Sequence, residues 1–377
     1  MRILIVSPYY KPGYKAGGPI QSTYNLSKLL ENKIEIFVFT QSNDFGENVI
    51  YNNIEENKWC ELDNHKVYYC SEKKFNIKTL KNIIDNVNPE LIYLNSLFHS
   101  LSWKAIITNK IRKLGPEIII APRGELDPGA LKLKSLKKSI FIKIIKYFIK
   151  KNIVFHATTI EEKPNIARFF SNKIRVAENV PNLILEKPVK EIKYKNKTNL
   201  VFISRISPKK NLSYCIDVLN KINVEGQINF DIIGPLEDKV YWNNIQKGIS
   251  NLNKNIILNY IGQVPNHELI TETTKYHYLF FPTKAENYGH IIYEALSYGI
   301  PVILSDQTPW REENNGVFVR SLDNINKFVN LIEDLHKIDN DEFSVLSTKA
   351  YEFAKNKVNI EEIKESYKNL FNATNTK

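Results

Sequence analysis

This sequence of 377 residues has little cysteine and no long apolar run. Its three cysteines, Cys60, Cys70 and Cys215, have no CxxC spacing and no histidine cluster nearby, which argues against a disulfide framework or structural zinc and fits a reducing cytosol. No apolar stretch approaches the roughly 20 residues needed to cross a bilayer. The apolar run after Met1 ends before Pro8 and is too short for a signal-peptide core, so we expect a first core strand and a cytoplasmic protein.

Low-complexity segments and internal repeats are also missing. Hydrophobic residues make up 43% of the chain and charged residues 25%, as in folded soluble proteins, so we expect disorder only in the tail after Phe371. The formal net charge of +11 favours an anionic partner, such as nucleic acid, acidic phospholipid or a phosphorylated substrate. Without an aromatic stacking platform or a recognisable reading module, nucleic acid is not the expected partner.

Short β-branched runs alternate with longer segments of helical period, which predicts an α/β protein with parallel sheets. The length suits two domains, and the periodicity fails over residues 181–198, which we interpret as a linker. We therefore expect two Rossmann-like domains facing each other across a cleft, 1–185 and 186–358, then a C-terminal helix and tail over 359–377. In such sheets ligands bind beyond the carboxyl ends of the strands.

The elements behind this division are predicted from the same periodicity. Expected strands cover residues 3–7, 34–40, 66–70, 91–95, 117–121 and 154–158, and then 200–204, 229–233, 256–261, 278–281 and 301–304. Expected helices of the first domain cover residues 19–30, 77–86, 101–114, 136–151 and 160–170.

Two cations follow the first expected strand of the second domain. Arg205 and Lys210 leave the carboxyl end of that strand and enter a helix. A guanidinium and an ammonium at a helix start suit a diphosphate, because the cations and the helix dipole all favour negative charge. A solvated basic turn explains this motif alone equally well.

Two glutamates mark the strongest motif of the chain. Glu286 precedes a helix and Glu294 lies two turns inside it, so both carboxylates can face the same cleft. The backbone amides of Asn287, Tyr288 and Gly289 form an uncapped helix start, which binds anions, and a nearby carboxylate accepts hydrogen bonds from sugar or ribose hydroxyls. A surface helix with two solvated glutamates is the alternative, but it does not explain three poor helix formers between an apolar strand and an apolar helix.

Glu286 and Glu294 have the Glu-x7-Glu spacing of retaining glycosyltransferases with the GT-B fold, and the chain resembles family 4 of these enzymes. Arg205 and Lys210 have the spacing of that family's Arg-x4-Lys pair. The resemblance extends over most of the chain through Gly17-Gly18 before a helix, Gly234-Pro235 after a strand, and residues 261–264 before the next helix.

The resemblance implies a nucleotide-sugar donor, UDP-linked, with no other cofactor. The donor site that it implies consists of Gly17, Gly18, Arg205, Lys210, Gly234, Gln263, Val264, Glu286, Asn287, Tyr288, Gly289 and Glu294. In this implied site, the Arg-x4-Lys pair holds the diphosphate and Glu294 binds the ribose. Glu286 and the amides at the helix start hold the sugar. The backbone of Gln263 and Val264 meets the nucleobase. The Gly-Gly pair lets the first domain's backbone approach the phosphates, unless it is an ordinary flexible turn.

The chain departs from the family pattern at Pro122-Arg123-Gly124, where many relatives carry Pro-His-Gly. Arginine cannot act as a base at neutral pH, but it can stabilise a departing diphosphate. The expected catalytic residues are therefore Arg123, Glu286 and Lys210. An equally weighted alternative is that Arg123 pairs with Asp127 and fixes the loop.

The expected acceptor-binding residues are Asn95, Arg123 and Glu125, where Asn95 occupies a position that is often histidine in such relatives. The segment 44–64, with Trp59, is expected to form acceptor loops. His99 and His156 are expected to be buried and hydrogen-bonded, and His290 is a weaker candidate for the donor site.

The mechanism implied by the resemblance is retaining and metal-independent, because no Asp-x-Asp motif follows a strand in the expected place. No isolated carboxylate stands out as a nucleophile, which favours front-face attack by the acceptor. The alternatives are a nucleotide-sugar epimerase, a phosphorylase-like enzyme on the same fold, and a non-catalytic basic module that binds membrane or nucleic acid. The complete set of two cations and two glutamates argues against the last.

The segment 132–151 carries eight lysines interleaved with apolar residues at helical spacing. Such a helix is typical of membrane-surface binding, here at the inner face of the cytoplasmic membrane. A helix that packs on the first domain with its lysines in water is the equally weighted alternative. Either way, a basic surface near the expected acceptor entrance favours a lipid-diphosphate-linked saccharide, as in surface-polysaccharide (O-antigen or capsule) biosynthesis.

Overall fold

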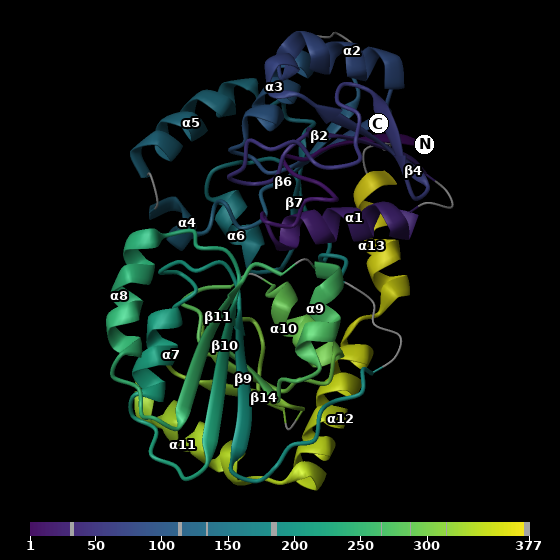
Figure 1. Cartoon of the computed structure of the whole chain (residues 1–377). Coiled ribbons are helices and arrows are strands. Elements are labelled where there is room, and N and C mark those ends of the chain that lie inside the picture. Colours follow the sequence, from purple (N-terminus) through teal and green to yellow (C-terminus); the bar gives the residue numbers. More distant parts are fainter. Residues whose placement is uncertain are drawn as a thin grey trace. The chain divides into compact units, whose positions relative to one another are not determined.

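The computed structural model describes residues 1–30, 34–111, 115–132, 135–181, 187–264, 266–286, 288–313 and 315–372. The chain divides into two compact units (Figure 1): unit 1 comprises Met1–Asn182 and Asn359–Lys377, and unit 2 comprises Leu183–Val358. The expected boundary between residues 185 and 186 lies outside the described residues. Each unit contains a mainly parallel sheet with helices, so the predicted α/β class is confirmed.

The sheet of unit 1 has the strand order β3-β4-β2-β1-β5-β6-β7-β8. Its strands are β1 (Arg2–Val6), β2 (Glu35–Gln41), β3 (Trp59–Leu62), β4 (His65–Cys70), β5 (Leu91–Asn95), β6 (Glu117–Ala121), β7 (Val154–Ala157) and β8 (Ile174–Val176). β3 runs antiparallel to β4, whereas β1 pairs in parallel with β2 and β5. Continuous apolar runs such as β1 are buried on both faces, which is typical of parallel sheets.

The helices of unit 1 differ from expectation mainly in the basic segment. They are α1 (Gly18–Leu30), α2 (Ile77–Val87), α3 (Ser100–Ile111), α4 (Pro128–Lys132), α5 (Ser135–Phe148), α6 (Glu162–Ala167) and α13 (Ile360–Asn372), with a 3-10 turn at Glu72–Lys74. The segment 132–151 therefore contains the end of α4 and all of α5, and residues 133 and 134 lie outside the described residues. Trp59 lies in a strand instead of an acceptor loop, because β3 pairs with β4. α13 packs against β8.

The sheet of unit 2 is parallel throughout its described strands, with the order β11-β10-β9-β12-β13-β14. The strands are β9 (Lys197–Ile203), β10 (Gln227–Ile233), β11 (Ile256–Gly262), β12 (Tyr278–Phe281), β13 (Val302–Ser305) and β14 (Val317–Arg320). Numbered from β9, this is the doubly wound order 3-2-1-4-5-6, whose switch point lies between its first and fourth strands. Ligands of such sheets bind at the switch point, here between β9 and β12.

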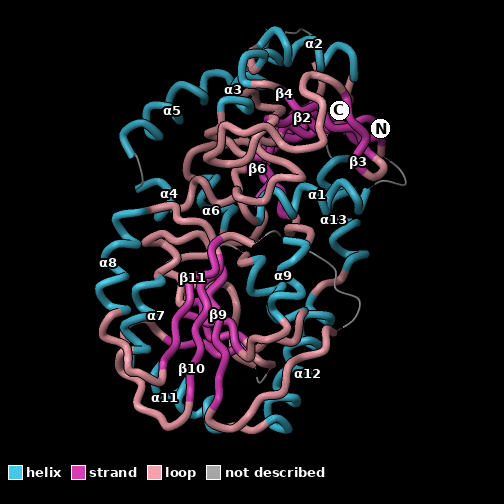
Figure 2. Tube along the Cα trace, viewed as in Figure 1, coloured by secondary structure: helices cyan, strands magenta, loops and turns pink. Residues whose placement is uncertain are grey.

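Helices cover both faces of the unit 2 sheet (Figure 2). They are α7 (Leu212–Leu219), α8 (Lys239–Ile249), α9 (Asn266–Thr273), α10 (His290–Ser297), α11 (Ile325–Lys337) and α12 (Asn340–Lys357). Asp339 and Glu342 form a capping box at the start of α12, and α10 packs against α12. Among the described helices of both units, none is long and apolar enough to span a bilayer.

Candidate functional site

The carboxyl ends of β9 and β12 bring Lys210 and Glu286 together. The Lys210 Nζ donates to Glu286 Oε2 at 2.5 Å, and the two side chains are 14% and 16% exposed. The same ammonium lies 5.4 Å from the ring centroid of Phe281, the last residue of β12. A cation and a carboxylate are thus held at the switch point of the sheet, where a doubly wound fold binds its ligand.

Backbone and side-chain hydrogen bonds join the loops that carry this pair. The Lys284 N–H donates to the Lys209 carbonyl at 2.9 Å, and Asn211 Nδ2 donates to the Pro282 carbonyl at 2.9 Å. The Glu286 N–H donates to the Gln307 carbonyl at 3.2 Å, in the loop after β13. Three loops therefore hold each other in place, which fixes the distance between the ammonium and the carboxylate.

The environment of Glu286 keeps its carboxyl group ionised. Burial by itself raises the pKa of Glu286, but the charge and hydrogen bond of Lys210 lower it, and Lys209 and His290 lower it further. The net result is a pKa below the ordinary value. A carboxylate that is ionised at neutral pH accepts hydrogen bonds only, as a partner for sugar hydroxyls must.

The start of α10 depends on glycine. Gly289 has φ +76°, and a Cβ there would lie 2.7 Å from Ile292 Cδ1 and 3.1 Å from Glu286 Cγ. A side chain at this position would therefore push into the helix and into Glu286. The carbonyl of Tyr288 accepts a hydrogen bond from Trp310 Nε1 at 2.7 Å. Asn287, the third residue of the expected anion site, lies outside the described residues.

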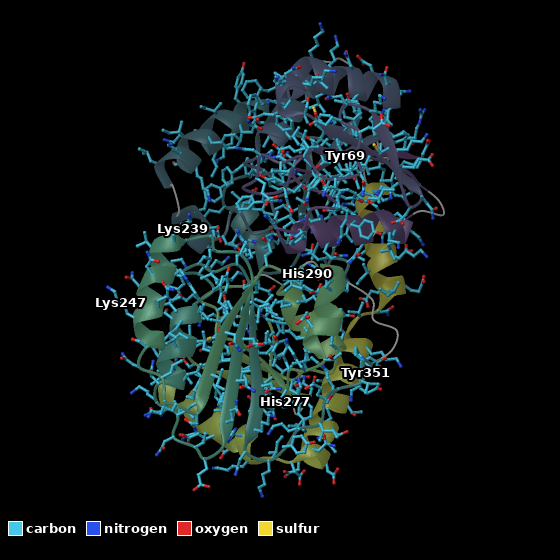
Figure 3. All side chains as sticks on the ribbon, in the orientation of Figure 1. Tyr69, Lys239, Lys247, His277, His290 and Tyr351 are labelled. Carbon is cyan, nitrogen blue, oxygen red and sulfur yellow. The ribbon has the colours of Figure 1, made fainter. Side chains whose placement is uncertain are left out.

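Glu294 is buried inside α10, at 7% exposure. Burial raises the pKa of the neighbouring Tyr293 to about 12, and the Glu294 charge adds to this shift. Figure 3 labels His290, the first residue of α10, whose ring centroid lies 4.9 Å from that of Tyr288. His290 therefore lies at the start of α10, beside the expected donor site.

Arg205 has a different partner from Lys210. Its Nη1 donates to Glu237 Oε1 at 3.1 Å, and both side chains are more than a third exposed. Gly234, at φ +141°, lets the two loops approach, because a Cβ there would lie 1.9 Å from the Ser204 carbonyl oxygen. Arg205 thus lies toward β10, whereas Lys210 lies toward β12.

Gln263 follows β11 directly, and its side chain carries an unusual feature. Its Nε2 is buried and has no hydrogen-bond partner within the described parts of the chain. The preceding Gly262 carbonyl accepts from Gly234 N–H at 2.7 Å, and Val264 packs against the core of unit 2. A buried amide donor without an acceptor is rare in folded proteins, and a ligand that supplies an acceptor is one explanation for it.

In unit 1, Arg123 follows β6 in a left-handed conformation, with φ +56°. Its guanidinium donates to Asn95 Oδ1 at 2.7 Å, to Tyr93 Oη at 3.2 Å, and to Asn179 Oδ1. Asp127 instead accepts a hydrogen bond from Asn165 Nδ2 at 2.8 Å, so the alternative pairing of Arg123 with Asp127 is not observed. Because the three acceptors are neutral oxygens, they orient the guanidinium without neutralising its charge.

A buried network lies behind Arg123. Tyr93 Oη and His156 Nδ1 are 2.7 Å apart, and His156 Nε2 lies 2.7 Å from the Ala177 carbonyl oxygen. Burial, with the charge of Arg123, lowers the pKa of His156 to about 3, so this histidine is neutral. Burial also lowers the pKa of His99 to about 4, and His99 Nδ1 accepts from Leu101 N–H at 3.3 Å. His156 is the buried, hydrogen-bonded histidine that was expected, whereas His99 is hydrogen-bonded but only half-buried.

Glu125 holds the loop after β5. Its Oε1 accepts from Ser96 Oγ at 2.6 Å, and its Oε2 accepts from the N–H groups of Leu97 and Phe98 at 2.6 and 3.2 Å. Burial raises the pKa of Glu125, although these hydrogen bonds act in the opposite direction. Both oxygens have partners within the loop, so contact with an acceptor stays a prediction.

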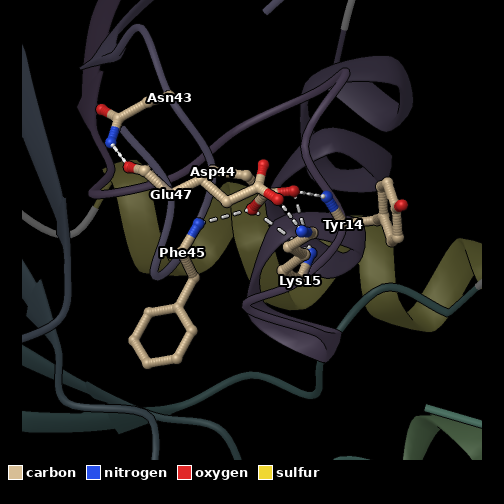
Figure 4. Close-up of polar contacts among 6 residues, drawn as sticks. All are labelled: Tyr14, Lys15, Asn43, Asp44, Phe45 and Glu47. Carbon is tan, nitrogen blue, oxygen red and sulfur yellow. Dashed lines mark hydrogen bonds and ion pairs between the residues drawn. The ribbon is translucent and has the colours of Figure 1, made fainter. Parts of the chain in front are cut away.

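The loop that leads to Gly17 and Gly18 is held by a residue that sequence reasoning missed. The Asp44 carboxylate accepts from the N–H groups of Tyr14 at 2.8 Å, Lys15 at 3.1 Å and Phe45 at 2.8 Å (Figure 4). Lys15 also pairs with Glu47. Gly17 has φ +76° with open space around its Cβ position. Asp44 is only 3% exposed. This burial could not be predicted from the sequence, because Asp44 is a single acidic residue in a polar segment.

The described residues contain no group of three or more His, Cys, Asp or Glu that could hold a metal ion.

Comparisons with known proteins agree with this fold. Residues 184–353 match the family model described as Glycosyl transferases group 1. An uncharacterised 41.2 kDa protein in the cps region of Klebsiella pneumoniae is 26% identical over 292 residues, which are 69% of this chain and 78% of that protein.

Two solved structures with the GT-B fold are similar over nearly the whole chain. HepE of Anabaena, crystallised in complex with UDP and glucose, has a TM-score of 0.68 at 14% identity and covers 99% of this chain and 100% of its own. WaaG, a glycosyltransferase involved in lipopolysaccharide biosynthesis, has a TM-score of 0.67 at 10% identity, with coverage of 97% and 99%. Residues 184–353 thus carry a group 1 glycosyltransferase domain, and the chain as a whole has the GT-B fold.

Proposed function

We propose that this enzyme transfers a sugar, with retention and without a metal, from a UDP-sugar to a hydroxyl of a lipid-linked saccharide. The observation that carries the proposal is the Lys210–Glu286 pair at the switch point of the unit 2 sheet. An ammonium can bind a diphosphate oxygen, and an ionised carboxylate can accept from sugar hydroxyls. Both groups are thus assigned to one donor, on either side of the bond that breaks.

The leaving group is the main electrostatic problem of this reaction. A sugar departs from a diphosphate that carries growing negative charge, and fixed cations stabilise that charge best in a site poor in water. We assign this role to Lys210 and Arg205, and further to Arg123, whose side-chain hydrogen-bond acceptors are neutral oxygens. With the leaving group stabilised in this way, the acceptor oxygen bonds to the anomeric carbon on the same face from which the bond to the diphosphate breaks. The proton of the acceptor hydroxyl passes to the leaving diphosphate oxygen, and no bound metal takes part.

The nucleotide is assigned from Gln263 and Glu294. The buried Gln263 Nε2 donor lacks an acceptor, and a carbonyl oxygen of uracil would supply one. The backbone of Gln263 and Val264 is assigned to the base, and Glu294 to the ribose hydroxyls. HepE, named as a complex with UDP and glucose, supports the choice of uridine.

The acceptor assignment rests on residues of unit 1 and on two similar proteins. Asn95 and Arg123 lie at adjacent strand ends and share a hydrogen bond. Asn95 is buried and also donates to Ser7 Oγ, so we assign the saccharide hydroxyl to the half-buried Arg123, with Asn95 orienting its guanidinium. WaaG is named for lipopolysaccharide biosynthesis, and the Klebsiella pneumoniae relative for the cps region. Both support a role in surface-polysaccharide biosynthesis with a lipid-linked acceptor.

The surface of α5 supports peripheral binding at the cytoplasmic face of the membrane. Ile142 and Ile145 are buried, so one face of the helix packs on unit 1. The opposite face exposes large apolar side chains: Leu136 at 75%, Ile140 at 51%, Ile144 at 57% and Tyr147 at 77%. Lys137 and Lys143 are exposed beside them. The helix thus has one face for the core and a second, lysine-flanked apolar face for lipid.

The test is a donor screen with purified protein. UDP- and GDP-sugars are incubated with EDTA, with and without a polyprenyl-diphosphate-linked saccharide, while nucleotide release and the anomeric configuration of the product are measured. We expect UDP release, an acceptor-dependent product and retention. Inversion, a requirement for added metal, or sugar interconversion without acceptor (an epimerase) would each contradict the proposal.

Matched variants test the site itself. Lys210→Ala and Glu286→Ala should each lower transfer by about 10²-fold or more, the usual cost of losing one preorganised charge at a transition state. Lys284→Ala removes an exposed lysine from the same loop and should retain activity. Full activity in a folded Lys210→Ala or Glu286→Ala protein would overturn the assignment.

A further inference from the structure

Unit 1 contains a pocket that none of the expected catalytic or donor-binding residues lines. Its Trp59 and Glu61 belong to the segment 44–64, which was expected to form acceptor loops. It has a volume of about 330 Å³ and is lined by Arg2, Phe37, Trp59, Glu61, Lys66 and Asn86, together with Val87. Arg2 begins β1 and Lys66 is the second residue of β4, so the pocket lies toward the amino ends of the strands. Arg123 and Asn95 lie at the opposite, carboxyl ends.

Strand register explains why these side chains share one face. Phe37 pairs with Lys66, and Lys66 pairs with Glu61, so the three stand side by side across β2, β4 and β3. Trp59 lies two residues before Glu61 and points to the same face, since side chains alternate along a strand. The helix α2 covers this face of the sheet through Ile84 and its neighbours, and the pocket opens beside the last turn of α2.

The floor of the pocket is aromatic. The ring centroids of Phe37 and Trp59 lie 5.4 Å apart at an interplanar angle of 76°, and Trp59 contacts Tyr68 at 5.4 Å in the same edge-on manner. Phe37 is 9% exposed and Trp59 is half-buried. The Lys66 Nζ lies 5.9 Å from the Phe37 ring centroid. An indole fixed by two other rings offers a rigid apolar surface that loses little entropy when a ligand packs on it.

The rim of the pocket is polar, with unused hydrogen-bonding capacity. The Arg2 Nη1 donates to the Val87 carbonyl at 2.9 Å, which fixes the guanidinium and leaves its other donors available. Glu61 and Lys66 are Cα partners across the edge of the sheet, yet across the described ranges they form no ion pair with each other. Two cations and one carboxylate therefore surround the aromatic floor, with the amide of Asn86 beside them.

We propose that this pocket is a second saccharide-binding site, which takes one or two sugar units and prefers a unit that carries a carboxylate. The apolar face of a sugar ring would pack on Trp59, its hydroxyls would meet Glu61 and Asn86, and its carboxylate would meet Arg2 and Lys66. The volume is at the small end of the range of about 300–1,000 Å³ for ligand pockets, which suits one or two rings better than a nucleotide-sugar.

The position of the pocket suits it to bind a part of the saccharide that is distant from Arg123. A strand of five residues spans about 17 Å at ~3.3 Å per residue, so a single sugar cannot reach both this pocket and Arg123. A chain of several units bound here would keep its other parts near the enzyme and raise their effective concentration. The inference rests on the proposed function for the class of ligand and on the pocket itself for the site.

Calorimetric titration without donor tests the site. The probes are a hyaluronan tetrasaccharide, which contains glucuronate, and neutral maltotetraose. We expect the acidic tetrasaccharide to bind, the neutral one to bind at least tenfold more weakly, and the variants Trp59→Ala and Lys66→Glu to weaken binding at least tenfold. Lys73→Glu makes the same charge change at an exposed lysine outside the pocket and should leave binding unchanged.

Three results would overturn the proposal: no binding of either tetrasaccharide, equal binding of both, or equal weakening by Lys66→Glu and Lys73→Glu. Lys66→Glu leaves the donor site intact, so transfer to a short acceptor should proceed at the wild-type rate. If the pocket does not bind saccharide, the loss of transfer expected for Lys210→Ala is therefore unaffected. Failure of the proposed function would appear as absent transfer in the wild-type protein, whatever the pocket binds.

Discussion

At the scale of single residues, the Lys210–Glu286 pair links stability to function. The two charges are mostly buried, and each neutralises the other at 2.5 Å. Removing one partner leaves a charge in a poorly solvated place, which costs more than the pair itself contributes. Under the proposed function, this pair opens when a diphosphate binds the lysine and sugar hydroxyls bind the carboxylate, so that donor binding replaces one set of charge partners with another.

We expect Lys210→Met and Glu286→Gln each to lower the free energy of unfolding by about 1–3 kcal/mol at pH 7, while the double variant loses less than the sum. The pKa of Glu286 is lowered in the folded protein, so the pair's stabilisation is present above the ordinary pKa and is lost as pH falls through the folded value. Urea unfolding at pH 7 and pH 4 measures both effects. Additive losses at pH 7 would contradict an energetic coupling between the two side chains.

A second residue-scale prediction concerns Tyr367 on α13. Its hydroxyl is buried and has no hydrogen-bond partner among the residues the structure describes. Tyr367→Phe removes this unpaired group and should raise the unfolding free energy by about 1 kcal/mol. Tyr93→Phe is the matched control, because the Tyr93 hydroxyl has partners in Arg123 and His156, and its removal should destabilise by about 1–2 kcal/mol. Thermal unfolding of both variants checks the opposite signs.

At the scale of elements, α5 carries an exposed apolar surface. Its exposed face repeats every three or four residues through Leu136, Ile140, Ile144 and Tyr147, while a different face packs on unit 1. Sequence periodicity alone left two interpretations of this helix, membrane surface or core packing. The structure gives the helix a buried face and an exposed apolar face together, so the two interpretations are compatible.

We expect Ile140→Ser with Ile144→Ser to weaken binding to vesicles of 30% anionic phospholipid by about tenfold or more, since each buried apolar side chain contributes about 1.5–3 kcal/mol. Val240→Ser is the control, because Val240 is 71% exposed on α8 in unit 2. Vesicle co-sedimentation at low and high salt measures the effect, and high salt should weaken binding through the lysines. Unchanged binding of the double variant would exclude α5 as the lipid surface.

At the scale of the whole molecule, buried histidines set the acid limit of stability. Burial lowers the pKa of His99 to about 4, and of His156 and His277 to about 3. The unfolded chain, with histidine pKa values near 6.5, therefore binds more protons than the folded protein below that pH. Stability must fall as pH drops from about 6.5 toward the folded values, by up to about 1.4 kcal/mol per pH unit for each histidine.

Urea unfolding between pH 7.5 and 5 should show this loss. A fourth histidine, His336, also has a pKa lowered by burial. His156→Asn removes one of these four titrating groups and should reduce the slope, whereas an exposed substitution such as Lys73→Glu should leave it nearly unchanged. A flat dependence between pH 7 and 5 would show that these histidines titrate in the folded protein much as they do in the unfolded chain.

Much of the fold follows from local sequence. Buried runs such as β1 and β9, and glycine-led turns such as Gly234, predict the α/β class because these signals depend on near neighbours alone. β8 and β14 were not expected, since short strands at or near a sheet edge are held by their pairing partner more than by their own residues. The same limit explains β3, which contains Trp59.

The sequence by itself determined the class of fold. The spacing of Arg205 and Lys210, and that of Glu286 and Glu294, pointed to one donor site, because strand ends and helix starts put short motifs at predictable places. Only the tertiary structure decided which groups touch. In the tertiary structure Arg123 bonds to Asn95 and Tyr93 instead of Asp127, and the buried Asp44 accepts hydrogen bonds from three backbone amides. Gln263 and Tyr367 each keep one buried polar atom without a partner among the described residues. These outcomes depend on contacts between segments far apart in the chain, and neither composition nor periodicity encodes such contacts.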